Sequence, residues 1–147
     1  MASEITIPDA KPAYELIDGR LVQKMSPKTR HSLIQYAIAA TLAAWAGEDA
    51  AIGTEWRFRI ADGHKRHALV PDVACVARER LLAIPAGETR EEPPFAPDIA
   101  VEILSPGDDQ RLLDLKIEAY LRNGGRLVLI SDPLGRTMNA HDSRSCL

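Results

Sequence analysis

Asp98-Ile99-Ala100-Val101-Glu102-Ile103-Leu104 is the most strand-like segment of this 147-residue sequence. After its first residue the run is apolar except for Glu102, which is typical of a strand covered on both faces. Ser105-Pro106-Gly107 then breaks the strand, and Asp108 or Asp109 can cap a following helix. The segment therefore predicts a buried central strand that carries one carboxylate.

The next segment, Arg111–Arg122, is predicted to be a helix that ends at Asn123-Gly124-Gly125. At about 100° per residue its charged residues cluster on one side, except for Lys116. Lys116 lies in the middle of the apolar arc and so faces the sheet. Because an unpaired buried ammonium is costly, such a lysine extends to solvent, pairs with a carboxylate or takes part in chemistry. An ion pair that only locks the helix to the sheet remains the alternative.

Two elements are expected before this region. Tyr14–Ile17 and Arg20–Val22 flank Asp18-Gly19, which predicts an N-terminal β-hairpin with a two-residue turn. His31–Ala46 is rich in Ala, Leu and Ile and ends at a glycine, which predicts a long helix. Its second part, Tyr36–Ala46, is nearly all apolar and is expected to be buried.

The middle of the chain is expected to contribute strands. Ala51–Ile60 and Ala68–Ala77 are predicted to pair antiparallel around the turn at Asp62-Gly63. Ala83–Pro97 is rich in proline and is expected to be a surface loop without regular structure, and Arg126–Ser131 is predicted to be the last strand. The order α-β-β-β-α-β after a hairpin predicts an α/β (α+β) fold in which helices flank a mixed sheet.

The composition is that of one ordinary globular domain spanning residues 1–147, with 46% hydrophobic residues, 27% charged residues and a net charge of −3. Residues 1–11 lack the apolar core of a secretory signal, so a cytoplasmic protein is expected. No apolar stretch approaches the roughly 20 residues that span a bilayer, so no membrane is expected as a partner. Cys75 and Cys146 form neither a metal-ligand pattern nor a disulfide framework.

Local charge differs from net charge between Trp56 and Arg80. Three acids there accompany eight basic side chains: Arg57, Arg59, Lys65, Arg66, Arg78, Arg80, His64 and His67. This segment is either a patch that contacts phosphates or a solvated hairpin with long cationic side chains.

Two carboxylates in apolar strands suggest chemistry. Asp72 follows Pro71 at the start of one strand, and Glu102 lies inside another. Acids in such positions are unusual for packing alone, and we expect Asp72, Glu102 and Lys116 to meet at one edge of the sheet. Oxygen ligands of this kind suit Mg²⁺ or Mn²⁺, and a neighbouring lysine can orient water and offset phosphate charge. The pattern indicates phosphodiester hydrolysis.

These residues resemble the PD-(D/E)xK nuclease fold. More closely, residues from about 12 to 133 resemble the Uma-two family of putative restriction endonucleases. The resemblance rests on the following motifs: Tyr14–Gly19, Met25-Ser26-Pro27, His31, Pro71-Asp72-Val73, Pro97–Pro106, Lys116, Tyr120 and Gly124. It implies a restriction-endonuclease-like core and an Mg²⁺-dependent endonuclease that acts on DNA, with Asp72 and Glu102 as metal ligands.

The resemblance also implies roles for individual residues. The superfamily lysine usually follows the glutamate by two positions, where this chain has Leu104, so Lys116 is expected to replace it from the helix. Glu15 matches a family position and either approaches the metal or its water, or faces solvent. His31 either reaches the site or caps the core, and Asp98 is expected to be a hydrogen-bonding residue at a strand end.

The C-terminal segment departs from the family pattern. The family usually has a further strand pair after the last core strand, whereas residues 134–147 are short and polar. We therefore expect an atypical tail, explained by truncation, a frame shift or disorder. A homodimer is one way of covering the sheet edge that such a tail would expose.

Two other functions compete with the nuclease. A catalytically inactive module of the same fold would bind nucleic acid through the basic segment, or serve in assembly. A serine or cysteine hydrolase is disfavoured because the sequence lacks a Gly-x-Ser-x-Gly motif and a plausible cysteine and histidine pair.

Overall fold

The computed structural model describes residues 5–143, which form two β-sheets and four helices. The four-stranded sheet has the order β2-β1-β5-β4, with bounds Arg20–Gln23, Tyr14–Ile17, Lys65–Leu69 and Phe58–Asp62. The five-stranded sheet has the order β3-β6-β7-β8-β9, with bounds Ala50–Thr54, Val73–Ala77, Ile99–Ile103, Leu127–Asp132 and Thr137–Asp142. The helices are α1 (Thr29–Ala46), α2 (Arg78–Leu82), α3 (Glu88–Glu91) and α4 (Gln110–Arg122).

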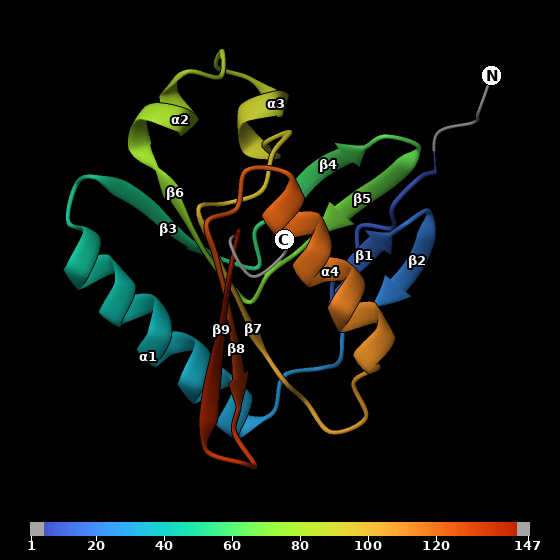
Figure 1. The fold of residues 1–147 in the computed structure, drawn as a ribbon, viewed down its shortest axis with the longest axis vertical. Helices are drawn as coiled ribbons and strands as arrows, with labels where there is room; N and C mark the ends of the chain where they lie inside the picture. Colours follow the sequence, from blue (N-terminus) through green and yellow to red (C-terminus); the bar gives the residue numbers. More distant parts are fainter. Residues whose placement is uncertain (1–4, 144–147) are drawn as a thin grey trace.

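The five-stranded sheet lies between the two long helices, α1 and α4 (Figure 1). All its neighbouring strands are antiparallel except β7 and β8, which are parallel and are connected through α4. One face packs against apolar residues of α1. The other face, α4 and the four-stranded sheet enclose the larger core, whose fully buried centre includes Tyr120 and Phe58. The expected mixed sheet flanked by helices is therefore present.

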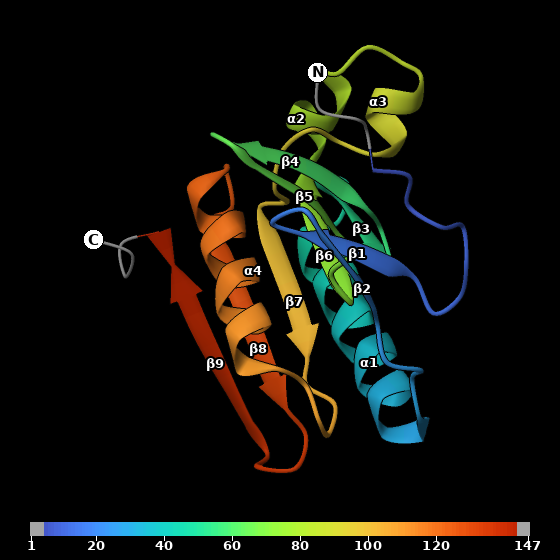
Figure 2. The same cartoon turned by 90° about the vertical axis from the view of Figure 1, so that its right-hand side faces the viewer.

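The four-stranded sheet packs beside α4 through β1 and β4, as the rotated view shows (Figure 2). Its first hairpin turns at Asp18 and Gly19, whose φ angles of 50° and 79° suit the tight turn predicted from the sequence. β1 then pairs with β5 through Leu16 and Ala68. This pairing brings the N-terminal hairpin beside the middle of the chain.

The two long strands predicted between residues 51 and 77 are each divided, which corrects the sequence prediction. The first breaks into β3 and β4 at Glu55, whose φ of 52° is left-handed and takes the chain out of the sheet. The second breaks into β5 and β6 at Val70-Pro71-Asp72, where proline removes a backbone donor. The predicted antiparallel pairing is right, but β3 with β6 and β4 with β5 belong to different sheets.

Two segments expected to lack structure contain elements. The short helices α2 and α3 lie in and beside the predicted loop of residues 83–97. In the expected atypical tail, β9 pairs antiparallel with β8. Leu127 lies opposite Asp142 at one end of this pair, and Asp132 lies opposite Thr137 at the other. The strand predicted at residues 126–131 is thus not the last one. Residues 144–147, which include Cys146, lie outside the described residues.

Helix α1 is more exposed than its composition suggested. None of its residues is buried, and Leu33, Tyr36 and Trp45 are exposed. Only one side, which includes Ile34 and Ile38, packs against the sheet. An apolar composition all round the helix did not reveal which side would be covered. No helix within residues 5–143 is long and apolar enough to cross a membrane.

Candidate functional site

Four candidate residues from four elements line one cavity of about 210 Å³. Glu15 comes from β1, Asp72 precedes β6, Glu102 lies in β7, and Lys116 lies on the inner side of α4. All four side chains are buried, with exposed fractions between 2% and 7%. The structure thus brings together every residue singled out for the site, Glu15 included.

The two strand carboxylates are neighbours because of the register between β6 and β7. Val73 faces Val101, so one further step along the antiparallel register places Asp72 opposite Glu102. Asp72 Oδ2 also accepts a 2.7 Å hydrogen bond from the backbone N–H of Ile103. Side chains of directly opposed residues lie on the same face of a sheet, so both carboxylates face the cavity.

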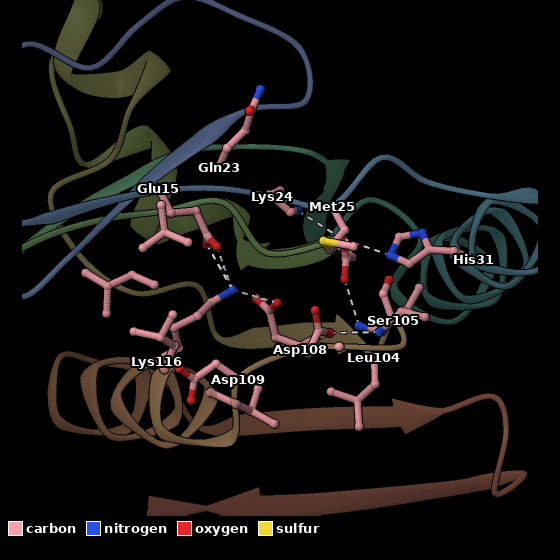
Figure 3. Close-up of a pocket in the computed structure, with 18 residues that line it drawn as sticks. Glu15, Gln23, Lys24, Met25, His31, Leu104, Ser105, Asp108, Asp109 and Lys116 are labelled. Carbon is pink, nitrogen blue, oxygen red and sulfur yellow. Dashed lines mark hydrogen bonds and ion pairs between the residues drawn. The ribbon is translucent and has the colours of Figure 1, made fainter.

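Lys116 joins the carboxylates of the two sheets, as Figure 3 shows for its bonds towards Glu15. Its Nζ lies 2.9 Å from Glu15 Oε2 and 2.8 Å from Glu102 Oε2. Tyr120 donates its hydroxyl hydrogen to Glu102 Oε1 at 3.0 Å, and Val70 donates its backbone N–H to Glu15 at 2.9 Å. We call Glu15, Glu102, Lys116 and Tyr120 the Lys116 cluster.

Burial and charge oppose each other in this cluster. Burial raises the pKa of Glu102 to about 7, and the charges of Asp72 and Glu15 add to this effect while Lys116 opposes it. For Lys116 burial alone would lower the pKa, but Glu102 and Glu15 outweigh burial and raise it above its usual value. Lys116 is therefore an ammonium, whereas Glu102 titrates near neutral pH.

A second lysine, Lys24, binds Asp72 from the other side, and the sequence did not single it out. Lys24 Nζ donates to Asp72 Oδ1 at 2.9 Å, to Glu55 Oε2 at 2.9 Å and to the Val70 carbonyl oxygen at 2.7 Å. Its pKa is raised because nearby carboxylates, Asp72 first, outweigh the effect of burial. No sequence signal marks it, since a lysine between a hairpin and Ser26-Pro27 is normally solvated.

Two residues of α1 complete this second group. His31 Nε2 lies 3.4 Å from Asp72 Oδ1, so His31 reaches the site rather than the core, while its Nδ1 has no hydrogen-bond partner among the described residues. Gln35 donates to the Asp72 carbonyl oxygen at 2.8 Å and to Glu55 at 3.1 Å. We call Lys24, His31, Gln35, Glu55 and Asp72 the Lys24 cluster.

The Lys24 cluster keeps Asp72 ionised. Burial would raise the pKa of Asp72, but the hydrogen bond with His31, the charge of Lys24 and the Ile103 N–H together hold it well below its usual range. In return, the hydrogen bond with Asp72 raises the pKa of His31. The two candidate metal ligands therefore differ: Asp72 stays ionised well into the acid range, whereas Glu102 is ionised mainly above a pH of about 7.

Three of the eight basic side chains between Trp56 and Arg80 contact acids. Arg57 and Arg59 both lie against Glu92. Arg80 binds Asp98 at 2.7 Å, and Asp98 also accepts from the backbone of β6, which is the strand-end role expected for it. A continuous stripe of unpaired cations is therefore not formed by these arginines.

The oxygen donors of the cavity suit a hard divalent cation such as Mg²⁺ better than zinc. Within residues 5–143 no three His, Cys, Asp or Glu side chains are grouped so that they could hold a metal by themselves, which argues against a closed zinc-type site. Mg²⁺ instead commonly uses one or two carboxylates and completes its shell with water and substrate phosphate. Asp72 and Glu102 supply two oxygen donors of this type on one cavity wall.

Comparisons with known proteins find one family and a similar solved structure. A family model named Uma2 and described as a putative restriction endonuclease matches residues 4–144. The crystal structure of a putative nuclease belonging to DUF820 from Anabaena variabilis is similar, with a TM-score of 0.83 and 28% sequence identity. The match covers 94% of this chain and 76% of that one. A search of curated proteins finds no match.

Proposed function

This chain belongs to the Uma2 family of putative restriction endonucleases, and from that membership and the cavity we propose that it is a metal-dependent endonuclease that hydrolyses DNA phosphodiester bonds. One observation carries the proposal: the buried carboxylates of Asp72 and Glu102 lie side by side on adjacent strands and line the same cavity as Lys116. Burying acids in this way costs stability, and ionisable groups in such environments are typical of functional sites.

Each residue of the cavity has a distinct role in this proposal. Asp72 and Glu102 would hold Mg²⁺ or Mn²⁺ through their carboxylate oxygens. When bound, the metal would offset the charge of the scissile phosphate and lower the pKa of a water molecule. Lys116 would orient that water or a phosphate oxygen with its ammonium. Glu15, which binds Lys116 at 2.9 Å, would hold the ammonium at the required position.

The second candidate is an inactive nucleic-acid-binding or assembly module of the same fold. One observation favours it: Lys116 and Lys24 already neutralise the carboxylates of the cavity through short contacts. A fully paired polar group of this kind can specify a structure without catalysing a reaction.

The test is cleavage of supercoiled plasmid and of single-stranded DNA with Mg²⁺, Mn²⁺ or EDTA. The wild type should cut with either metal and not with EDTA, whereas Asp72→Asn and Glu102→Gln should be inactive but folded in thermal melts. Glu118→Gln is the matched control, because Glu118 lies on the exposed face of α4 and contacts Arg122. A wild type that cuts nothing, or an Asp72→Asn variant that cuts normally, would rule the mechanism out. Salt-sensitive DNA binding without cleavage would select the inactive module.

A further inference from the structure

Lys24 uses its whole hydrogen-bonding capacity inside the protein. Its ammonium has three N–H groups, and Nζ has three acceptors within 2.9 Å: Asp72 Oδ1, Glu55 Oε2 and the Val70 carbonyl oxygen. The side chain is 12% exposed. Lys24 therefore has no spare donor for a substrate, and of the three groups that it binds, Asp72 is the candidate metal ligand.

Glu55 holds Lys24 from the opposite side in a backbone conformation that is unfavourable for glutamate. Its φ of 52° lies in the left-handed region, where a non-glycine residue is held only by its surroundings. Its two carboxylate oxygens bind Lys24 and Gln35, and 44% of the side chain is exposed. One ammonium is thus shared between a buried carboxylate, Asp72, and a half-exposed one, Glu55.

We propose that Lys24 serves as the built-in counter-ion of Asp72. In this role it weakens the binding of a divalent cation to the Asp72 carboxylate. Glu55 sets the strength of this competition because it shares the ammonium with Asp72, at 2.9 Å from each carboxylate. The inference rests on the proposed function, because it concerns the metal that Asp72 would hold.

The physical basis is repulsion between two cations that use one carboxylate. Lys24 contacts the same oxygen, Oδ1, that His31 approaches at 3.4 Å, while Oδ2 accepts from Ile103. A divalent cation that approaches Asp72 therefore meets a fixed positive charge in a cavity where charges are poorly screened. Substrate phosphate adds negative charge and further oxygen ligands, so metal binding becomes favourable when DNA is present.

The experiment measures Mn²⁺ and Mg²⁺ binding to metal-free protein by calorimetry without DNA. Lys24→Met should bind metal at least tenfold more tightly than the wild type, because Asp72 loses its internal cation. Glu55→Gln should bind at least threefold more weakly, because the ammonium then turns to Asp72 alone. Lys24→Arg should stay near the wild type. Lys28→Met is the matched control, since Lys28 is an exposed lysine of the same connection and should have no effect.

The opposite shifts separate this role from simple loss of structure. Lys24→Met leaves two carboxylates without their cation, so it is expected to melt at a lower temperature without metal and to be rescued by Mn²⁺. If it does not fold, Glu55→Gln decides alone. Unchanged or weaker binding in Lys24→Met, or unchanged or tighter binding in Glu55→Gln, would overturn the inference. If wild type and Asp72→Asn bind metal equally, the proposed function fails first and this inference with it.

Discussion

The carboxylate of Asp72 accepts a 2.7 Å hydrogen bond from the backbone N–H of Ile103, the residue that follows Glu102. This bond fixes the start of β6 to β7 at the point where the two candidate ligands meet. A side-chain acceptor thus continues the ladder beyond the last strand pair, Val73 and Val101. Changes at Asp72 are therefore expected to affect both the chemistry and the sheet.

Asp72→Asn should cost stability at neutral pH, and the cost should become smaller in acid. The pKa of Asp72 is held below its usual value in the folded protein, so its contribution is present above about pH 4 and lost as pH falls further. We expect a loss of about 3 kcal/mol at pH 7, the range for breaking a buried ion pair. Urea unfolding at about pH 7 and about pH 3 measures it, and at about pH 3 the cost should be reduced but still present. A difference that stays constant with pH would contradict this assignment.

Glu102→Gln should change how the free energy of unfolding depends on pH on the neutral side of the range. The unfolded chain releases this proton near pH 4.5, whereas the folded protein keeps it until a pKa of about 7, so stability falls as pH rises through this interval. The difference corresponds to on the order of 3 kcal/mol. Relative to Glu102→Gln, the metal-free wild type should lose this much between about pH 4.5 and pH 8 in urea unfolding. Parallel profiles of the two proteins would show that Glu102 does not titrate there.

Metal affinity should rise with pH because Glu102 has to lose its proton before it can bind a cation. With a pKa of about 7, roughly a tenth of Glu102 is ionised at pH 6 and roughly nine tenths at pH 8. Mg²⁺ should therefore bind about tenfold more tightly at pH 8 than at about pH 6. Calorimetry in two buffers of different ionisation enthalpy measures both the affinity and the proton released. The idea is rejected by an affinity that is independent of pH and releases no proton.

Lys116→Met should separate metal binding from turnover. The variant keeps an apolar stem on the inner side of α4 but leaves Glu15 and Glu102 without a cation. We expect cleavage to fall at least about 100-fold while Mg²⁺ still binds, and stability to fall by about 3–5 kcal/mol. Single-turnover cleavage and urea unfolding give the two quantities.

A double variant controls for stability in that experiment. Glu15→Gln with Lys116→Met removes one of the two uncompensated charges, so it should regain part of the stability and none of the cleavage. Recovery of cleavage in the double variant would mean that Lys116 acts only by keeping the protein folded.

The sequence predicted those parts of the site that break a regular pattern. Glu102 stood out inside an apolar strand, and Lys116 stood out on the apolar side of a helix. Both exceptions were visible because the surrounding periodicity was strong. Lys24 was missed for the opposite reason: it lies outside any helix or strand, where a lysine departs from no pattern. Only the three-dimensional contact with Asp72 distinguishes it.

The errors in the fold have a similar origin. The break at Glu55 depends on a left-handed residue that is not glycine, which local propensity does not indicate. The strand β9 was missed because Thr137–Asp142 has only two apolar residues, Met138 and Ala140, which make too short an alternation to indicate a strand. By contrast, the Asp18-Gly19 turn follows from local chemistry and was predicted, and the cap predicted at Asp108 or Asp109 lies at Asp109. Elements held by distant contacts are those that a local pattern predicts least well.

The ion pairs of the cavity join residues that are far apart in the sequence and are therefore synthesised at different times. Lys116 lies 101 residues after Glu15, and Asp72 lies 48 residues after Lys24. A ribosome therefore releases the hairpin and the acidic strands well before the lysine that unites them. Until α4 has left the exit tunnel, the growing chain carries the acids of the cavity without the ammonium that joins the two sheets.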